Sequence, residues 1–295
     1  MPIEPQNRKT RSQADSATGE GASGGNRVLS LFDALAHSSA IAASVAASFV
    51  WAVSLALGLA PDAAVVTLAA TGTLVVYNVD RLRDVERDRL LAPLRSQFVA
   101  ENRKRLVALS SVAALASLVS AAVLPTSTGV LCGAVLALGL LHRRLKRVRG
   151  IKTLYLTGSW LSVTVGLPVL AAPTNARPDF ETLYWVGLVV GCAIVSNLMA
   201  SNLDRRRANE SAGHANARRR LNPAIAVAGL GLGVALVAPE ALRGFALIPG
   251  AEFLALSRYR PRERYAAVVL DGALFVGACG AIACFVLWGP GSPGA

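Results

Sequence analysis

Residues 77–89 read YNVDRLRDVERDR and come directly after an apolar stretch of the chain. Asp80, Asp84 and Asp88 recur at every fourth position of this segment. On an α-helix such a spacing turns by only about 40° per step, so the three carboxylates form one stripe along the helix. The segment therefore predicts a helix that leaves an apolar environment and carries an acidic stripe at its end.

The composition of the whole chain indicates what that environment is. Hydrophobic residues make up 53% of the 295 residues and charged residues 16%, whereas a soluble domain typically carries about 25% charge. The mean hydropathy is +0.47. Lys and Arg nevertheless total 30 against 18 Asp and Glu, which gives a net charge of +12. This combination predicts a polytopic membrane protein whose charges are concentrated in a few loops.

The composition argues against several other classes of protein. A nucleic-acid binder would need a solvated domain to carry the basic surface, so we expect no nucleic-acid partner. The four cysteines lie in apolar runs and none is spaced as CxxC, so neither a disulfide framework nor a zinc site is indicated.

Between two polar tails the chain contains nine apolar stretches. A membrane-spanning helix needs about 20 apolar residues, and by this rule the fourth, seventh and eighth stretches are short. The nine stretches are residues 31–60, 63–79, 105–124, 128–141, 153–173, 181–203, 223–238, 241–257 and 265–288. We expect an all-α bundle of nine transmembrane helices over residues 30–288, a disordered cytoplasmic tail over 1–29 and a C-terminal tail over 289–295.

Basic residues alternate along the chain. The connections after the second, fourth, sixth and eighth stretches hold the arginine clusters, whereas the other connections are short and nearly uncharged. Cytoplasmic loops of membrane proteins are enriched in Lys and Arg. The N-terminus and the four basic loops are therefore predicted to be cytoplasmic and the C-terminus extracytoplasmic. We expect an integral, multi-pass protein of a bacterial inner or plasma membrane.

The acidic stripe suits two different roles. Mg²⁺ binds one or two carboxylates together with substrate phosphate oxygens, and interleaved arginines such as Arg81 are suited to hold phosphate directly. On this interpretation Asp80, Asp84 and Asp88 are metal ligands and catalytic residues, and Asn78 and Arg81 contact the substrate. The alternative is a solvated helix at the membrane surface, in which Asp and Arg pair three or four residues apart.

The end of the sixth stretch repeats part of the first motif. Residues 202–205 read NLDR and residues 78–81 read NVDR, and both segments end an even-numbered stretch. Asn197 lies inside the sixth stretch, where a polar side chain faces a bundle interior or cavity or makes a hydrogen bond between helices. The basic loop over residues 141–152 suits either a clamp for an anionic headgroup or diphosphate, or a topogenic loop that binds anionic lipids.

Three more polar residues interrupt the apolar stretches. We expect His37 to make an interhelical hydrogen bond. Glu252 and Asp271 lie within or near the ends of their stretches, so each either joins a polar cavity or pairs with a nearby loop arginine.

The first motif resembles that of the UbiA superfamily of intramembrane prenyltransferases. That family has nine transmembrane helices and two Asp-rich motifs, at the cytoplasmic ends of helices two and six. Its first motif typically reads Asn-Asp-x-x-Asp-x-x-x-Asp. In this chain Asp80 and Arg81 replace the first two residues of that motif, and Asp84 and Asp88 match its last two acids.

Further positions extend the resemblance over roughly residues 30–288. The family often continues into a Pro and an Arg, as at Pro93 and Arg95, and carries Leu-Lys-Arg after helix four, as at residues 145–147. Its second motif, Asp-x-x-Asp-x-x-x-Asp-x-x-x-Gly, departs more in this chain. Here Asn202, Arg205 and Asn209 replace the three acids, Gly213 fits, and Asp204 is the nearby carboxylate.

The resemblance implies a Mg²⁺-dependent prenyltransferase that moves an isoprenoid group from a prenyl diphosphate to a lipophilic, membrane-embedded acceptor. Mg²⁺ at Asp84 and Asp88 would hold the diphosphate. The implied substrate-binding residues are Asn78, Arg81, Arg95, Lys146, Arg147, Asn197, Asn202, Asp204, Arg205 and Asn209. The alternatives are a non-catalytic UbiA-like protein that binds isoprenoid or other lipid, and a UbiA-type terpene cyclase. A transporter is disfavoured because no clear charged relay crosses the middle of the membrane.

Overall fold

The computed structural model describes residues 31–89, 92–145, 151–207, 214–260 and 265–289. Only the backbone is described at residues 87, 140–145, 151, 202–207, 214–220, 266 and 267. Within these ranges the regular structure is entirely helical and no strand is present. The all-α prediction is therefore confirmed, whereas the two predicted tails lie almost wholly outside the described residues.

The first apolar stretch folds as two helices rather than one. Leu31–His37 and α2 (Ala40–Ala56) meet at an angle of 70°. Ser39 stands at the break with φ 65°, in the left-handed region that L-residues adopt only rarely. A straight helix over residues 31–60 was expected, and the break at Ser39 divides it.

The second stretch forms the helix that carries the acidic segment. Helix α3 runs from Ala63 to Asp88 without interruption, so the predicted helical stripe is helical throughout. Its first turn is capped by Asp62, whose carboxylate accepts from Ala64 N at 2.7 Å and Val65 N at 3.3 Å. Such a cap satisfies backbone donors that have no partner within the helix.

The connection after α3 contains a helix that the sequence analysis treated as a loop. Helix α4 (Pro93–Glu101) begins with Pro93, which suits a first helical position because its missing N–H would have no intrahelical partner there. Helix α4 packs against α3. Helices α5 (Arg103–Val123) and α6 (Thr126–Leu145) follow.

The second half of the chain consists of longer helices joined by short helical turns. The elements are α7 (Ile151–Leu161), η1 (Ser162–Gly166), α8 (Leu167–Ala171), η2 (Thr174–Ala176), α9 (Phe180–Arg207), α10 (His214–Val237), η3 (Glu240–Ala246), α11 (Leu247–Ser257), η4 (Tyr265–Leu270) and α12 (Asp271–Leu287). Turn η1 is a π-helical segment in which Leu167 N donates to Ser162 O. It precedes Pro168, whose ring prevents the regular α-helical hydrogen bond.

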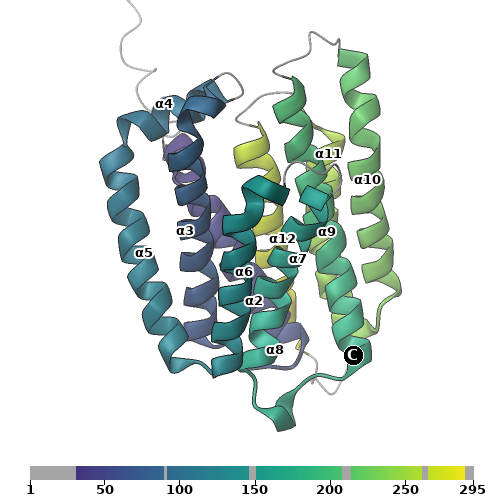
Figure 1. Cartoon of the computed structure of the whole chain (residues 1–295). Helices are drawn as coiled ribbons and strands as arrows, with labels where there is room; N and C mark the ends of the chain where they lie inside the picture. Colours follow the sequence, from purple (N-terminus) through teal and green to yellow (C-terminus); the bar gives the residue numbers. More distant parts are fainter. Residues whose placement is uncertain (1–30, 90–91, 146–150, 208–213, 261–264, 290–295) are drawn as a thin grey trace, which may run out of the picture.

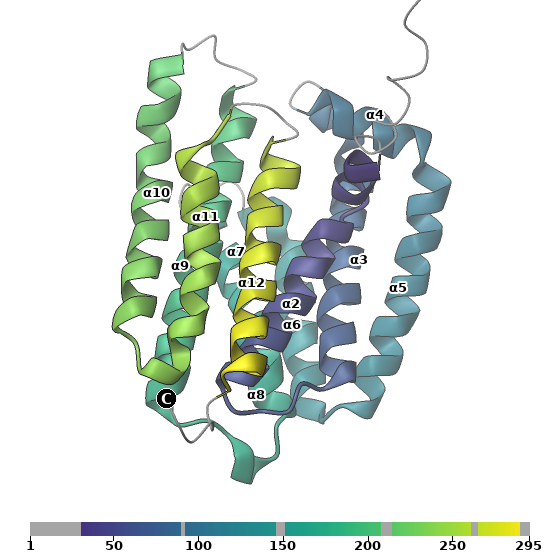
Figure 2. The ribbon, with the colours of Figure 1, turned by 180° about the vertical axis from the view of Figure 1, so that it is seen from behind.

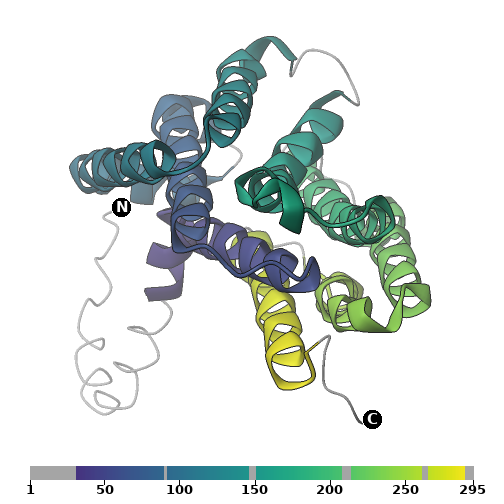
Figure 3. The same ribbon diagram turned by 90° about the horizontal axis from the view of Figure 1, so that it is seen from below.

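The long helices run alternately up and down between the two ends of a bundle (Figures 1 and 2). Helix α4 lies at one end, together with the C-terminal ends of α3, α9 and α11 (Figure 1). Helix α8 and the C-terminal end of α12 lie at the other. Seen from below, α5 and α6 lie on the outside of the bundle (Figure 3). Many of their large apolar side chains are exposed, including Val112, Leu118 and Val130, as expected for helices that face lipid.

The largest buried core joins the first, middle and last parts of the chain. It contains Phe49 of α2, Val190 of α9, Phe245 of η3, Ile248 of α11 and Ala278 of α12, all essentially inaccessible to solvent. Because these residues come from five elements far apart in the sequence, the core holds α2, α9, α11 and α12 together.

By length and composition, five helices of the described chain can cross a membrane, or six if the bent N-terminal pair counts as one span. The five are Ala63–Glu86, Arg103–Val123, Lys152–Ala171, Phe180–Ser201 and Val268–Leu287. Thr126–Gly139 and Leu221–Val237 are apolar but shorter. Several long apolar helices support a membrane protein, and nine crossings remain a prediction.

Candidate functional site

Helix α3 turns one face toward the bundle interior. Tyr77, Arg81, Asp84 and Asp88 are spaced i, i+4, i+7 and i+11, which places them on one side of a helix. Tyr77 lines a pocket in the bundle, and Asp84 is only 7% exposed. Asp80 lies outside this spacing and is exposed. The inward-facing row thus contains Arg81, Asp84 and Asp88 rather than all three acids of the predicted stripe.

Asp88 is engaged by α4. Its carboxylate forms an ion pair with the Arg95 guanidinium, and both side chains are mostly buried, with 18% and 17% of their surfaces exposed. The predicted contact between Arg95 and substrate is therefore replaced in this structure by a contact within the chain. Mg²⁺ or diphosphate at Asp88 would have to compete with this pair or include it.

Arg81 points toward the N-terminal helix pair. Its guanidinium donates to the backbone carbonyls of Ala36 and His37, each at 2.7 Å. These carbonyls end the helix Leu31–His37, where the regular hydrogen-bond pattern stops. Arg81 also interacts electrostatically with Asp271 of α12. It was expected to hold phosphate oxygens, and in this structure it caps a helix and links α3 to α12.

Asn78 is fully buried beside the same break. The Ser39 hydroxyl donates to Asn78 Oδ1 at 2.7 Å. No acceptor from the described part of the chain reaches Asn78 Nδ2. One amide hydrogen-bond donor therefore remains to be satisfied in the interior of the bundle.

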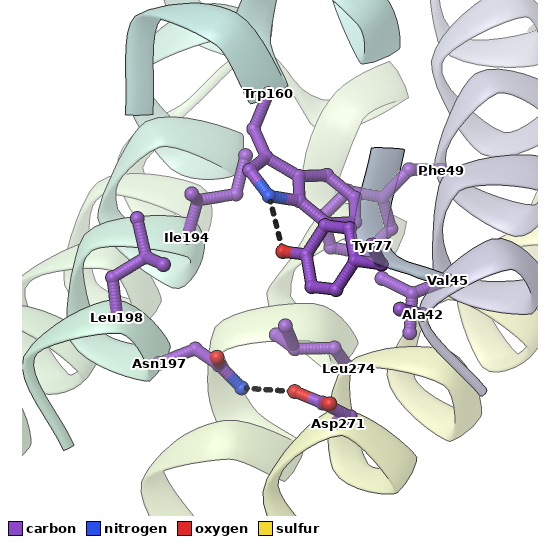
Figure 4. Close-up of a pocket in the computed structure, with 10 residues that line it drawn as sticks. All are labelled: Ala42, Val45, Phe49, Tyr77, Trp160, Ile194, Asn197, Leu198, Asp271 and Leu274. Carbon is purple, nitrogen blue, oxygen red and sulfur yellow. Dashed lines mark hydrogen bonds between the residues drawn. The ribbon is translucent and has the colours of Figure 1, made fainter. Parts of the chain in front are cut away.

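A small pocket lies between α2, α3, α7, α9 and α12 (Figure 4). Trp160 Nε1 donates to the Tyr77 hydroxyl at 3.1 Å, and the two rings meet edge to face with centroids 6.3 Å apart. Opposite them, Asn197 Nδ2 donates to Asp271 Oδ1 at 3.3 Å. The remaining lining residues are apolar: Ala42, Val45, Phe49, Ile194, Leu198 and Leu274. The pocket therefore has an aromatic wall, an aliphatic wall and one polar corner.

The pocket is narrow. Its free volume is about 30 Å³, which is room for roughly one or two water molecules. Tyr77 reaches the pocket from the same face of α3 that carries Asp84, so the polar end of α3 adjoins the apolar interior.

A second acid lies close to the polar corner. Glu252 of α11 is fully buried and interacts electrostatically with Asp271. Asn197 also lies close to Glu252, but within the described chain no donor reaches either carboxylate oxygen in hydrogen-bonding geometry. Of the two interpretations that the sequence left open, both describe Asp271, which lines the pocket and interacts with Arg81. Glu252 is buried beside Asp271 but is not among the residues that line the pocket. The sequence signal was an ionisable residue within an apolar stretch.

The structure does not bring every predicted site residue together. Asp88 and Arg95 pair at one end of α3, one helical turn beyond Asp84, and Asn197 lines the pocket. Across the described residues no three His, Cys, Asp or Glu side chains are grouped closely enough to hold a metal ion. Asp80, Asp84 and Asp88 therefore do not form a preassembled three-carboxylate site.

Several predicted residues cannot be placed by their side chains. Asn202, Asp204 and Arg205 lie in the last turns of α9, where only the backbone is described. Lys146, Arg147 and Asn209 lie outside the described residues. The basic loop and the altered second motif thus remain predictions from the sequence.

Comparison with known proteins adds no relative. The chain matches no protein-family model, no curated protein and no solved structure. The likeness to the UbiA superfamily therefore rests on the motifs and helix pattern of this chain alone.

Proposed function

We propose that this protein is a UbiA-type intramembrane prenyltransferase, which transfers an isoprenoid group from a prenyl diphosphate to a lipophilic acceptor. The observation that carries the proposal is the inward face of α3. One helix places the buried Asp84 and the neighbouring Asp88 at its end and Tyr77 in an aromatic, apolar pocket two turns away. A substrate with an anionic head and an isoprenoid tail would match this order of polar and apolar groups.

The donor set is compatible with Mg²⁺. Asp84 and Asp88 supply hard oxygen ligands on one face of α3, and Mg²⁺ typically takes one or two carboxylates and completes its shell with phosphate oxygens and water. When bound there, Mg²⁺ would neutralise charge on the diphosphate. Asp80, at the exposed edge, is available to a metal-bound water. Lys146 and Arg147 of the basic loop would add positive charge near the leaving group.

The proposal requires the bundle to open. An isoprenoid chain is many times larger than the pocket's free volume of about 30 Å³. Helices around the pocket must therefore separate when the tail enters, and the apolar lining would then exclude water from the reacting carbon. Trp160, one of four tryptophans in the chain, lies in the pocket wall, so the fluorescence change that Trp160→Phe abolishes reports such entry.

The test uses the full chain in detergent with prenyl diphosphates of several lengths. We expect Trp160 fluorescence to change on binding in the presence of Mg²⁺, and pyrophosphate to be released when a suitable acceptor is added. Asp84→Asn or Asp88→Asn should weaken Mg²⁺-dependent binding about tenfold or more. Glu101→Gln, an exposed acid on α4, is the matched control and should bind normally. Wild-type affinity in both Asp variants would reject the proposed site.

The second candidate is a non-catalytic isoprenoid-binding protein with the same architecture. The observation that favours it is that Arg81 and Arg95 are engaged by groups of the chain itself. Binding that is indifferent to Mg²⁺ and releases no pyrophosphate would identify it, whereas pyrophosphate release without an acceptor would identify a terpene cyclase. Arg205→Ala separates the first two candidates further, because it weakens diphosphate binding only if Arg205 contacts the substrate.

A further inference from the structure

The cluster of Asn197, Glu252 and Asp271 has a chemistry that the proposed transfer reaction does not use. Its members come from α9, α11 and α12: α11 packs against both of the other helices, and Asn197 of α9 donates to Asp271 of α12. Glu252 is 0% exposed and has two carboxylate oxygens that no donor from the described chain reaches. Burying a carboxylate without partners is strongly unfavourable, so the cluster is incomplete as it stands.

A charge count indicates what completes it. If both carboxyls are ionised, Glu252 and Asp271 carry two negative charges, and the Arg81 guanidinium that interacts with Asp271 carries one positive charge. The three groups together then need one more positive charge to be neutral. Among the described residues, Tyr265 of η4 also interacts electrostatically with Glu252, but its hydroxyl donates to Ala255 O at 2.8 Å and contributes no cation. Arg258 and Arg260 interact with Tyr265 and not with Glu252.

The donor atoms are those of a site for a hard cation. The two carboxylates interact with each other, and Asn197, whose Nδ2 donates to Asp271, also adjoins Glu252 and brings an amide oxygen as a third ligand atom. Mg²⁺ fits such a place poorly, because it gives up its waters reluctantly and the adjoining pocket has room for only about one or two. A monovalent cation needs fewer waters and would balance the charge of Glu252, Asp271 and Arg81.

We propose that Asn197, Glu252 and Asp271 form an intramembrane site for one monovalent cation, in which Na⁺ competes with a proton for Glu252. Access runs through the pocket, because Asp271 and Asn197 line it and Glu252 lies behind them. Ionisable residues buried within membrane bundles commonly serve as sites for protons or ions. The site does not use Asp84 or Asp88, but its access shares the pocket that the isoprenoid tail would enter in the proposed transfer reaction.

The test is carbodiimide labelling, because carbodiimides modify protonated carboxyl groups in apolar surroundings. The full chain in detergent is treated with dicyclohexylcarbodiimide in choline chloride or NaCl, and Glu252 modification is read by peptide mass spectrometry. We expect labelling in choline chloride and about tenfold less in saturating NaCl. Glu252→Gln identifies the labelled position. NaCl should also raise the melting temperature of the wild type, but not that of Glu252→Gln.

A second variant keeps the proposal falsifiable if Glu252→Gln folds poorly. Asn197→Ala removes one oxygen ligand without changing the charge, so Glu252 should still be labelled and protection should require about tenfold more Na⁺. Asn175→Ala, at an exposed position in η2, is the matched control and should keep wild-type protection. Labelling that Na⁺ leaves unchanged would make this a proton site alone and overturn the proposal. Absence of labelling together with equal melting temperatures in both salts would overturn it as well.

Discussion

Arg81 is the residue that most changes how the acidic segment is understood. It closes the end of the helix Leu31–His37 by donating to the carbonyls of Ala36 and His37. It also provides a positive charge for Asp271 on the last helix. Because one side chain serves both contacts, α3 is tied to the start and to the end of the bundle through Arg81.

Removal of this side chain should destabilise the fold. Arg81→Ala removes the guanidinium donor from the carbonyls of Ala36 and His37 and the positive charge near Asp271, so we expect the free energy of unfolding to fall by about 2–4 kcal/mol. Thermal or denaturant unfolding in detergent measures the change. Adding Asp271→Asn to Arg81→Ala should recover part of the loss, because the uncompensated charge is then removed. Arg105→Ala, at an exposed position on α5, is the control, and equal stability of the two Ala variants would contradict this role.

The role of Arg81 could not be predicted from the sequence. The family resemblance places Arg81 where an acid is expected and suggested a phosphate contact. The observed contacts depend on a helix break at Ser39 and on an acid 190 positions later in the chain, at Asp271. The sequence around Arg81 reveals neither the helix break nor the distant acid. Asp84, by contrast, was singled out by its spacing, and the structure adds that its side chain is buried; its role as a metal ligand stays a prediction.

At the scale of elements, α11 and α12 meet at a glycine. A Cβ atom built on Gly277 would lie 2.7 Å from both Ile248 Cα and Leu247 O, which are backbone atoms of α11. Backbone cannot move aside as a flexible side chain can. The close approach of these helices, which brings Glu252 toward Asp271, therefore depends on the absence of a side chain at position 277.

Gly277→Ala should force the two helices apart. We expect a loss of about 1–3 kcal/mol in the free energy of unfolding, the usual cost of overpacking. Gly272→Ala lies in the same helix and its added Cβ meets nothing within 4 Å, so it should be neutral or stabilising by up to about 1 kcal/mol. The measurement is the melting temperature of each variant, Gly277→Ala and Gly272→Ala, in the same detergent. If both alanines have the same effect, the contact at Gly277 does not limit how closely the helices pack.

The order of the helices could be predicted from hydropathy, but their interruptions could not. Each apolar stretch corresponds to helical structure in the described chain. The π-helical segment at η1 arises because Pro168 removes one backbone donor, and its exact register depends on packing. Helix α4 was missed because its polar, charged sequence has no apolar periodicity. Its stability comes from the start at Pro93, from packing against α3 and from the Arg95–Asp88 pair.

For the whole molecule, the two ends of the bundle differ in chemistry. The end with α4 also carries the ends of α3, α9 and α11, which lead into the basic connections of the sequence (Figure 1). The opposite end carries α8 and the nearly uncharged connections. The alternation of charge along the sequence therefore becomes a separation in space, because each helix carries the chain to the other end. The sequence indicated this polarity, although in the described part of the chain five or six helices meet the length and apolarity expected of a span.

This polarity predicts an orientation in the membrane. The positive-inside rule places the α4 end in the cytoplasm, so a cysteine at Gln97 of α4 should be closed to a membrane-impermeant maleimide in intact cells. A cysteine at Asn175 of η2, at the opposite end, should be labelled from outside. Both positions are exposed in the structure, so failure to react cannot be due to burial. The native cysteines Cys132, Cys192, Cys279 and Cys284 set the background and are replaced by alanine if they react.

Comparing the cysteines at positions 97 and 175 separates access to the reagent from the reactivity of each thiol. After cell lysis both cysteines should react equally, which shows that access and not reactivity distinguishes them. A second pair, Asn222→Cys in the N-terminal half of α10, toward the predicted cytoplasmic side, and Ala241→Cys in η3, should repeat the pattern because α10 carries the chain between the two ends. Labelling of Gln97→Cys in intact cells with protection of Asn175→Cys would reverse the orientation and place the Asp84–Asp88 end outside. Labelling of all four would show that these helices do not cross the membrane between the tested positions.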